Sequence, residues 1–446
     1  MASTKLTRTN GTPTNTKIMT FSFWFKIGTQ TNQQSLISSV EAASGGSYTD
    51  LKIMNAATHN NVFRFECKTT EGNYIDLKFN RSLRDTGAFY NIIIAVDTTQ
   101  ATDTNRVKIY VNGVQETSFA TATYPTQNHN LDFSKSGIIQ QVGAYENTSY
   151  WNGLMSYFTF VDGTAYDQSY FGEVDSSSGI WKIKTAPSVT YGNNGFLLKM
   201  DTSSPGTDTS GNSNTFTASG TPTLTQDNAS NNFCTLTPLI RMAITLNNGN
   251  TQVTDTDSSW YGVGSTMGVS SGKWYWEYKL TRIGNYAQDG VMGGLGGNGY
   301  NDIYNTYVGS KTAGVALNTG EGKIYSADSS TTWFGSANSQ GQIIGVALDL
   351  DNNKIYYSQN GVFGNSSNPA TNTNGYALSA TIIANKPLLP CSSINNCTID
   401  YNFGNGFFGT TAVASSNADA AGYGLMEYAV PTGFYTLNTK NLNTYG

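Results

Sequence analysis

One short pattern occurs twice in this chain and closes a long apolar run each time. The first copy spans Lys108–Val114 and follows Ile92–Asp97, and the second spans Lys354–Val362 and follows Ile343–Asp349. Both copies begin Lys-Ile-Tyr and end Asn-Gly-Val, and Asn-Gly between apolar segments favours a type I′ hairpin, because that turn needs positive φ at both central residues. Two such hairpins so far apart predict two β-sandwich domains in tandem, an architecture more typical of binding modules than of catalysts.

The composition supports an all-β fold with many turns. Only 12% of the 446 residues are charged and 12% are aromatic, while Gly, Ser, Thr and Asn are abundant. Met19–Ile27 alternates in period two, with large apolar residues at its odd positions, as expected for a half-buried strand. Apolar residues show no sustained 3.6-residue period, so helix should be minor. We therefore predict two tandem antiparallel β-sandwiches.

Apolar segments and polar connections give the predicted boundaries. We predict the first domain over residues 1–217, a linker over 218–234 and the second domain over 235–446, with one helical turn at Tyr166–Phe171. Strands of the first domain are expected at Lys5–Thr9, Met19–Ile27, Leu36–Val40, Leu51–Met54, Val62–Cys67, Tyr74–Phe79, Tyr90–Asp97, Val107–Val111, Gly137–Gly143, Gly153–Val161 and Phe196–Met200. Strands of the second domain are expected at Lys273–Lys279, Gly290–Leu295, Gly314–Leu317, Lys323–Tyr325 and Thr398–Phe403, besides the hairpin.

Charge and hydropathy argue against several classes of partner. The net charge is −5 and no basic run occurs, so nucleic-acid binding is not expected. Met1–Leu6 lacks the apolar core of a signal peptide, and no segment approaches the about 20 apolar residues of a membrane span. We expect a chain made in a cytoplasm and used without secretion, as a virion component or an ordinary cytosolic protein. Cys391 and Cys397 either bridge a loop or stay free thiols, as a reducing compartment favours.

Two groups of motifs resemble known families. Thr20–Phe25, Ile92–Asp97, Lys108–Gly113 and Trp151–Gly163 resemble laminin-G-like (concanavalin A-like) jelly rolls, most closely those in structural proteins of marine bacteriophages. The segments 160–167, 171–173, 208–216 and 231–236 resemble the same phage group. The second half is similar to a SPRY domain, and the motifs that carry this similarity are Gly272–Glu277, Gly345–Asp349 and Ile355–Gly361.

The resemblance implies a virion structural protein without catalytic chemistry. It implies a tail fibre or tail tip component that binds a host-surface glycan or receptor and contacts other virion proteins of the tail or capsid. The alternative is a capsid-surface fibre or decoration protein of the phage head, and a carbohydrate-active enzyme is a minor alternative. The chain lacks an extended shaft, which favours a tip or decorating subunit. By analogy with phage fibres we expect a homotrimer, made in the host cytoplasm and displayed on the particle surface.

Three motifs begin like functional signatures but lack the required context. Gly294–Gly299 matches G-x-G-x-x-G, yet a loop follows where a dinucleotide site needs a helix. Asp349–Asn353 begins like an EF-hand loop, but Lys354 and Asn360 stand where that loop needs Gly and Glu, so a hairpin turn is expected. Glu173–Asp175 begins like the carboxylate pair of a glycosidase but runs into three serines. We therefore expect no enzymatic activity.

Candidate binding residues are aromatic side chains near predicted strand ends. They could stack on sugar rings, and the alternative is core or inter-subunit packing. These candidates are Tyr150, Trp151, Trp260, Tyr261 and Trp333. The resemblance to laminin-G-like domains, which often bind calcium, also implies a calcium site in a loop rich in Ser, Thr and Gly. Its candidate ligands are Asp201, Asp208 and Asn212, since hard cations need several oxygens; the alternative is that these residues make Asx turns.

Overall fold

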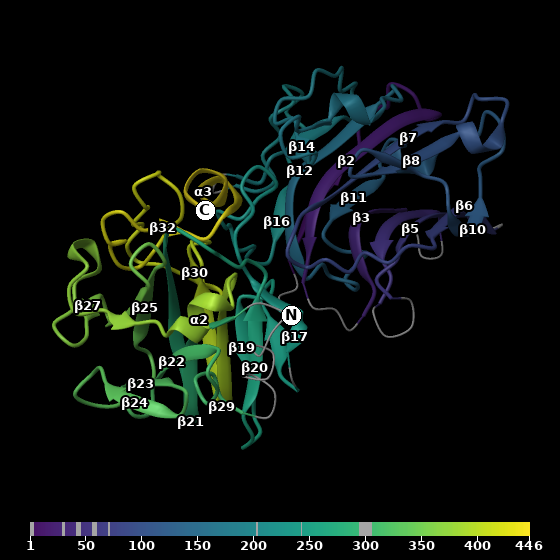
Figure 1. The fold of residues 1–446 in the computed structure, drawn as a ribbon. Coiled ribbons are helices and arrows are strands. Elements are labelled where there is room, and N and C mark those ends of the chain that lie inside the picture. The colour runs from purple at the N-terminus through teal and green to yellow at the C-terminus, as the bar shows by residue number, and fades with distance from the viewer. Residues whose placement is uncertain are drawn as a thin grey trace. The chain divides into compact units, whose positions relative to one another are not determined.

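The computed structural model describes residues 4–28, 32–41, 46–55, 60–69, 72–201, 204–241, 243–293 and 306–446 (Figure 1). It has 6% helix and 45% strand, which confirms the all-β prediction. The chain divides into two compact units, and the division lies inside the predicted linker 218–234. Unit 1 comprises Met1–Leu224 with Asn228–Ser230, and unit 2 comprises Thr225–Asp227 with Asn231–Gly446.

Unit 1 is built on two antiparallel sheets. Over the described residues, the larger sheet has the order β10 (Phe119–Thr123), β6 (Gly72–Phe79), β5 (Phe63–Thr69), β4 (Tyr48–Ile53), β3 (Gln34–Val40), β11 (Ile139–Val142), β1 (Lys5–Thr9) and β16 (Thr217–Ser219). The second sheet has the order β15 (Phe196–Leu198), β12 (Gly153–Asp162), β2 (Ile18–Ile27), β7 (Tyr90–Asp97), β8 (Val107–Val111) and β9 (Val114–Glu116). Short 3-10 turns lie at η1 (Asp103–Asn105), η2 (Asp132–Ser134) and η3 (Gln168–Tyr170), the last within the predicted helical turn.

The alternation in β2 places one row of side chains between the two sheets. Phe21, Phe23 and Phe25 are fully buried there, and the Phe23 ring stacks on that of Phe158 with centroids 4.8 Å apart. Trp24, on the opposite side of β2, is also buried. A second apolar cluster lies outside this sheet and joins Ile93, Tyr110, Val161 and Phe171. The hairpin of β13 (Gly172–Val174) and β14 (Trp181–Ile183) contributes Trp181 to that cluster.

Both Asn-Gly turns have the backbone that the sequence predicts. Asn112 and Gly113 have φ of 48° and 79° and join β8 to β9. Asn360 and Gly361 have φ of 47° and 81° and join β26 (Lys354–Gln359) to β27 (Val362–Phe363). A Cβ on Gly113 would lie 2.4 Å from the Trp181 ring, and one on Gly361 would lie 2.6 Å from the Tyr428 ring. Glycine is therefore needed twice over, for its φ and for its size.

Two long strands organise unit 2. β21 (Lys273–Gly293) and β29 (Leu388–Asn402) pair along most of their length, with bulges between Leu280 and Arg282 and between Ile283 and Tyr286. The first half of β21 pairs with β25 (Ile343–Asp349), and its second half pairs with β22 (Gly314–Asn318). The bulges re-aim the strand, so β21 contributes to two differently oriented parts of the sheet around a core that includes Trp274, Trp276 and Tyr278.

The remaining elements of unit 2 extend this framework. The main path of the sheet is β17 (Leu236–Arg241), β20 (Tyr261–Ser265), β29, β21, β22, β23 (Lys323–Ser326) and β24 (Ser329–Thr332). The other described elements are β18 (Thr245–Asn247), β19 (Gln252–Thr254), β28 (Tyr376–Ala377), β30 (Phe407–Phe408), β31 (Thr411–Ala412), β32 (Tyr435–Thr436), η5 (Pro369–Thr371), α2 (Ala380–Ala384) and α3 (Thr439–Tyr445). No helix among the described residues is long and apolar enough to cross a membrane.

Several sequence predictions are settled by unit 2. Asp349 pairs with Lys354, so the EF-hand-like segment is a hairpin turn, as expected. Cys391 and Cys397 are free and buried on one strand, β29. Six residues of extended strand span about 20 Å, whereas the Cα atoms of bridged cysteines lie less than about 7 Å apart. The two cysteines are therefore free thiols, the second of the two alternatives. The predicted strand Thr398–Phe403 is only the second half of β29. Residues 294–299 with the G-x-G-x-x-G motif, and the end of the predicted strand Gly290–Leu295, lie outside the described residues.

Candidate functional site

A cavity of about 450 Å³ opens beside Tyr150 in unit 1. Amide side chains dominate its lining, which comprises Asn32, Gln33, Gln34, Met54, Asn55, Ser149 and Tyr150. The loop that carries Tyr150 is fixed to the first residues of β3, because the Ser35 amide donates to the Ser149 carbonyl (2.9 Å) and the Asn152 amide donates to Gln34 Oε1 (2.7 Å). The volume of the cavity lies within the range of small-ligand sites, about 300–1,000 Å³.

Trp151 supports this loop and does not line the cavity. Its ring meets that of Phe25 edge to face with centroids 5.5 Å apart, and its side chain packs against the core of unit 1. The sequence analysis placed Tyr150 and Trp151 together as ligand-stacking residues. The structure separates their positions: Tyr150 lies at the cavity, and Trp151 takes the packing role that was the stated alternative.

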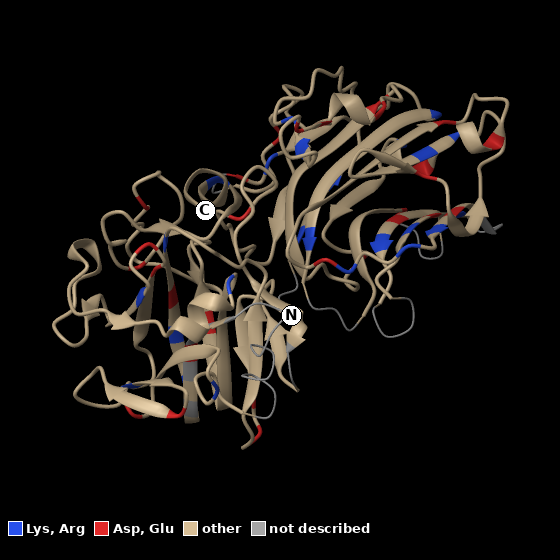
Figure 2. Cartoon of the chain, viewed as in Figure 1, with Lys and Arg blue, Asp and Glu red and all other residues tan. Residues whose placement is uncertain are grey.

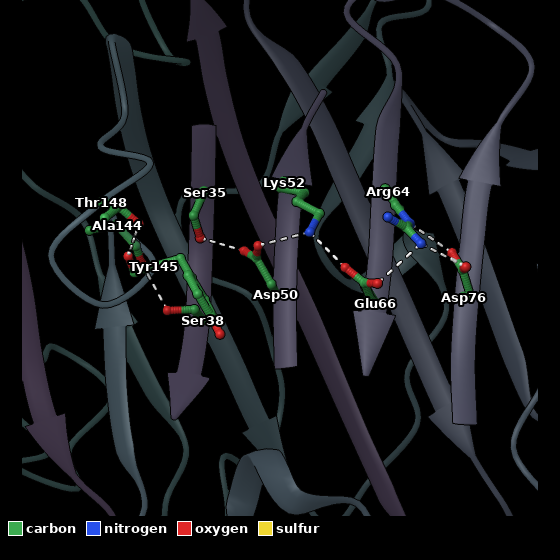
Figure 3. A network of polar contacts seen from close by, with 10 residues as sticks. All are labelled: Ser35, Ser38, Asp50, Lys52, Arg64, Glu66, Asp76, Ala144, Tyr145 and Thr148. Carbon is green, nitrogen blue, oxygen red and sulfur yellow. Dashed lines mark hydrogen bonds and ion pairs between the residues drawn. The ribbon is translucent and has the colours of Figure 1, made fainter. Parts of the chain in front are cut away.

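A row of charged residues crosses β4, β5 and β6 of the larger sheet (Figure 3). Lys52 Nζ contacts Glu66 Oε2 at 2.6 Å and Asp50 Oδ2 at 3.3 Å, and Arg64 Nη2 contacts Asp76 Oδ2 at 2.7 Å and Glu66 Oε1 at 3.1 Å. The row starts at the Ser35 hydroxyl, which donates to Asp50 Oδ1 at 2.6 Å. Figure 2 shows how positive and negative residues interleave on these strands. We call Asp50, Lys52, Arg64, Glu66 and Asp76 the charged row.

The strand register explains why the contacts in the charged row are diagonal. Asp50 pairs directly with Glu66, and Glu66 pairs directly with Asp76, so three carboxylates face one another across neighbouring strands. Like charges in such positions repel. Lys52 and Arg64 pair directly with each other one step along the strands and reach back to the carboxylates. Lys52 and Arg64 thus balance the repulsion between the carboxylates of neighbouring strands.

Burial shapes the titration of the charged row. Asp50 and Lys52 are 2% and 6% exposed, although they alternate with the core residues Leu51 and Ile53. Burial raises the pKa of Asp50, against smaller opposite effects of Lys52 and the Ser35 hydrogen bond. The bond to Asp76 raises the pKa of Arg64. These groups satisfy one another, so the charged row braces β4, β5 and β6.

The loop residues after β11 lie on the same side of the sheet as the charged row (Figure 3). Ser38 Oγ donates to the Ala144 carbonyl at 2.8 Å, and the Tyr48 and Tyr145 rings meet edge to face with centroids 5.3 Å apart. Thr148 Oγ1 donates to the Tyr145 carbonyl at 3.1 Å. These contacts connect the face of β3 and β4 to the loop that continues to Tyr150, so the cavity wall is anchored at both ends of the loop.

Glu173 and Asp175 do not form an acid–base pair. Glu173 is exposed and Asp175 is partly exposed, and Lys182 lies 3.3 Å from each carboxylate. Asp175 accepts hydrogen bonds from the Ser177 and Ser178 amides, and these bonds lower the pKa of Asp175 to about 2. Glycoside hydrolysis needs one carboxyl with a raised pKa as the proton donor, and the lowered pKa of Asp175 does not suit that role.

The calcium candidates have other partners in the structure. Asp208 Oδ1 accepts from the amides of Leu197 (2.9 Å) and Ser210 (2.8 Å), while Oδ2 accepts from Ser210 Oγ (2.9 Å) and the Asn214 amide (2.7 Å). The Asn212 side-chain nitrogen donates to the carbonyls of Gly192 and Gly195. Asp201 is exposed, and no cluster of three metal-ligating acids, histidines or cysteines occurs among the described residues. Asp208 thus braces its own loop, as the Asx-turn alternative expects.

In unit 2, only some of the candidate aromatics are accessible. Trp333 is 3% exposed and its indole nitrogen donates to the Tyr357 carbonyl at 2.8 Å, so it belongs to the core and cannot meet a ligand as proposed from the sequence. The Tyr261 hydroxyl donates to Asp257 Oδ2 at 3.1 Å, and its ring packs at the edge of the core. Trp260 is half-buried, and its ring contacts that of Tyr307. Tyr307 lies outside every predicted strand. No signal in the sequence pointed to Tyr307.

Comparison with known proteins agrees with this architecture. Residues 2–168 match the concanavalin A-like lectin/glucanases superfamily, and residues 273–406 match the SPRY domain family. The chain therefore contains a concanavalin A-like domain followed by a SPRY domain, and these domains suggest a binding role. A search of curated proteins finds no significant match.

Solved structures show similarity over about a third of the chain. The SPRY domain of human HERC1 is 16% identical, covers 37% of this chain and 96% of its own, and has a TM-score of 0.30. A human SPRY domain is 12% identical, with coverages of 36% and 95% and a TM-score of 0.28. The heptameric SAP-like pentraxin of Limulus polyphemus is 15% identical, with coverages of 37% and 72% and a TM-score of 0.27.

Proposed function

We propose that this chain is a non-enzymatic structural protein of a bacteriophage particle, in the tail fibre or tail tip, that binds a host-surface glycan through the cavity beside Tyr150. The observation that carries the glycan-binding part is the lining of that cavity, in which four amide side chains surround one tyrosine. The phage part rests on the resemblance of the motifs in the first domain, and of the segment 231–236 that follows it, to phage structural proteins. The binding role suggested by the two domain families supports both parts.

The cavity has the chemistry that a neutral sugar needs. Asn and Gln side chains offer donors and acceptors at once, as hydroxyl groups do, and the tyrosine offers a ring face and a polar tip. Gln34 is already oriented by its bond from the Asn152 amide, so part of the site is organised before ligand binding. One such site gives weak affinity, and several copies on a particle raise avidity by roughly 10²–10⁴.

The test is binding of host polysaccharide fragments to the full chain and to a Tyr150→Ala variant, measured by isothermal titration calorimetry. We expect the variant to bind about tenfold more weakly, because it loses one ring contact of about 1 to 1.5 kcal/mol. Tyr170→Ala is the matched control, since Tyr170 is also a partly exposed tyrosine of unit 1 but lies on η3, away from the cavity. Equal loss in both variants, or none in Tyr150→Ala, would contradict the site.

Immunogold labelling of intact virions with an antibody to this chain tests the location. Label on the tail supports the tail-fibre role, and label spread over the head favours the alternative, a capsid-surface fibre or decoration protein. Absence of label from every particle would contradict a virion protein altogether. Light scattering tests the proposed trimer, and turnover of host polysaccharide in a released-sugar assay would contradict the non-enzymatic assignment.

A further inference from the structure

Unit 2 carries an aromatic cluster on the side of its sheet that faces away from the main core. Along β20, Tyr261 and Val263 contact the main core, so the alternate residues Gly262 and Gly264 face the other side. That other side holds a small apolar cluster with Cys391, Met292 and Ala316. Tyr325 is the direct partner of Ala316 and shares this side, and Trp260 immediately precedes β20.

Tyr307 joins Trp260 to Tyr325. The Val308 amide donates to Ser393 Oγ at 3.2 Å and the Val308 side chain is fully buried, which fixes the segment against the sheet. The Tyr307 ring then lies 5.6 Å from the Trp260 ring and 5.9 Å from the Tyr325 ring, at interplanar angles of 54° and 81°. All three rings are half-buried. We call Trp260, Tyr307 and Tyr325 the aromatic cluster.

Carboxylates stand at the edge of the aromatic cluster. The Tyr307 hydroxyl donates to Asp328 Oδ1 at 2.8 Å, and the Tyr325 hydroxyl donates to Glu321 Oε2 at 2.9 Å. Burial and then Asp328 raise the pKa of Tyr307 to about 12, so the phenol stays protonated and bonded to the acid. Lys323 contacts Glu321 at 3.1 Å, whereas Asp328 has no ion pair among the described residues.

We propose that the aromatic cluster binds a lysine or arginine side chain from a basic segment of a protein partner. A cation is attracted to the faces of electron-rich rings within about 6 Å of their centroids, and a phenol that donates to a carboxylate carries additional electron density. The three half-buried rings pack against one another at steep angles, so they do not form the flat platform on which a sugar ring stacks. Asp328 supplies the opposite charge that a bound cation needs. The backbone of the exposed Lys311 lies beside this segment, because its carbonyl accepts a hydrogen bond from the Ala327 amide.

This site differs from the glycan cavity in unit, in lining and in ligand. The cavity beside Tyr150 is lined by neutral amides, and the aromatic cluster is edged by acids. A particle protein with both sites would hold a basic protein segment through one unit and a neutral glycan through the other. The two proposals can therefore fail independently.

The test is fluorescence anisotropy with the full chain and a fluorescein-labelled peptide of six Lys-Gly repeats, compared with the same peptide made with Glu. We expect the lysine peptide alone to bind. Trp260→Ala should weaken its binding about two- to thirtyfold, the range of a single cation–π contact. Tyr307→Phe keeps the ring but loses the bond to Asp328, and Asp328→Asn keeps the shape but loses the charge; both should weaken binding without loss of the fold.

The control is Tyr150→Ala, which should leave peptide binding unchanged while it weakens glycan binding. Circular dichroism of each variant shows that the fold is kept. The proposal is wrong if the lysine peptide does not bind, if the Trp260→Ala, Tyr307→Phe and Asp328→Asn variants bind it like the unaltered chain, or if a neutral oligosaccharide displaces it. Displacement by the oligosaccharide would assign the aromatic cluster to sugars instead.

Discussion

Two groups of buried acidic residues, one in each unit, are held in opposite ways. In unit 1, every carboxylate of the charged row has Lys52 or Arg64 within 3.3 Å. In unit 2, Glu277 is held by the backbone amides of Glu427 and Tyr428 and by the Tyr275 hydroxyl, without a cation. Asp289 goes further, since neither of its oxygens has a hydrogen-bond partner among the described residues.

This difference bears on how the two groups of acids respond to pH. In unit 1, burial raises the pKa of Asp50, and Lys52 and the Ser35 hydrogen bond oppose that effect. Burial raises the pKa of Glu277 to about 7, and it raises the pKa of Asp289 well above the usual value, against a smaller lowering by Trp276. Unit 2 is thus stabilised when these acids carry protons, whereas unit 1 depends on the presence of both charges.

The largest effect is expected from Lys52→Met in unit 1. This change leaves the carboxylates of Asp50 and Glu66 buried and directly opposed without their shared cation. Removal of one partner from a buried ion pair costs about 3–5 kcal/mol, and urea denaturation followed by tryptophan fluorescence measures that loss. Lys182→Met is the matched control, because Lys182 makes ion pairs of similar length on the surface. The control should leave the unfolding midpoint unchanged, and an equally small effect of Lys52→Met would refute the role of the charged row.

A smaller effect is expected from the titration of Glu277 in unit 2. The pKa of Glu277 is about 7 in the folded chain against 4.5 when free, so the folded state binds more protons between these values. The resulting stabilisation is full below pH 4.5 and is lost as pH rises to about 7, a change of about 3 kcal/mol. Chemical denaturation at a series of pH values measures it.

Glu277→Gln separates this residue from the other titrating groups. The variant stays neutral, so its free energy of unfolding should fall less between pH 4.5 and 7 than that of the unaltered chain. Asp289→Asn should likewise flatten the pH dependence of the free energy of unfolding. It should leave the contribution of Glu277 unchanged. Parallel curves for the Glu277→Gln variant and the unaltered chain would show that Glu277 does not titrate in this range.

The contrast between the units also marks what the sequence could predict. Both Asn-Gly hairpins and the alternating strand Met19–Ile27 are local patterns, and the structure has them as predicted. The charged row was not predicted, because its members come from three strands and meet only through the register of β4, β5 and β6. Tyr307 was missed for the same reason, since its neighbours Trp260 and Tyr325 are distant in sequence. The prediction that Trp333 is accessible to a ligand was wrong. Most of its neighbours in sequence are polar, which suggests an exposed position, but residues distant in sequence bury its side chain.

The smallest effect is expected at the candidate calcium loop of unit 1. Asp208 accepts four hydrogen bonds that hold residues 197–214 together. Asp208→Asn keeps the size and one acceptor oxygen, and each oxygen accepts two of these bonds, so the loss should be about 2 kcal/mol, the net value of two hydrogen bonds. Calcium or EDTA should not shift the melting temperature of the unaltered chain, because the carboxylate that would hold the ion is already filled by N–H and O–H donors. A rise in melting temperature with calcium that Asp208→Asn abolishes would instead establish an ion site, in which a cation from solution balances the charge of Asp208.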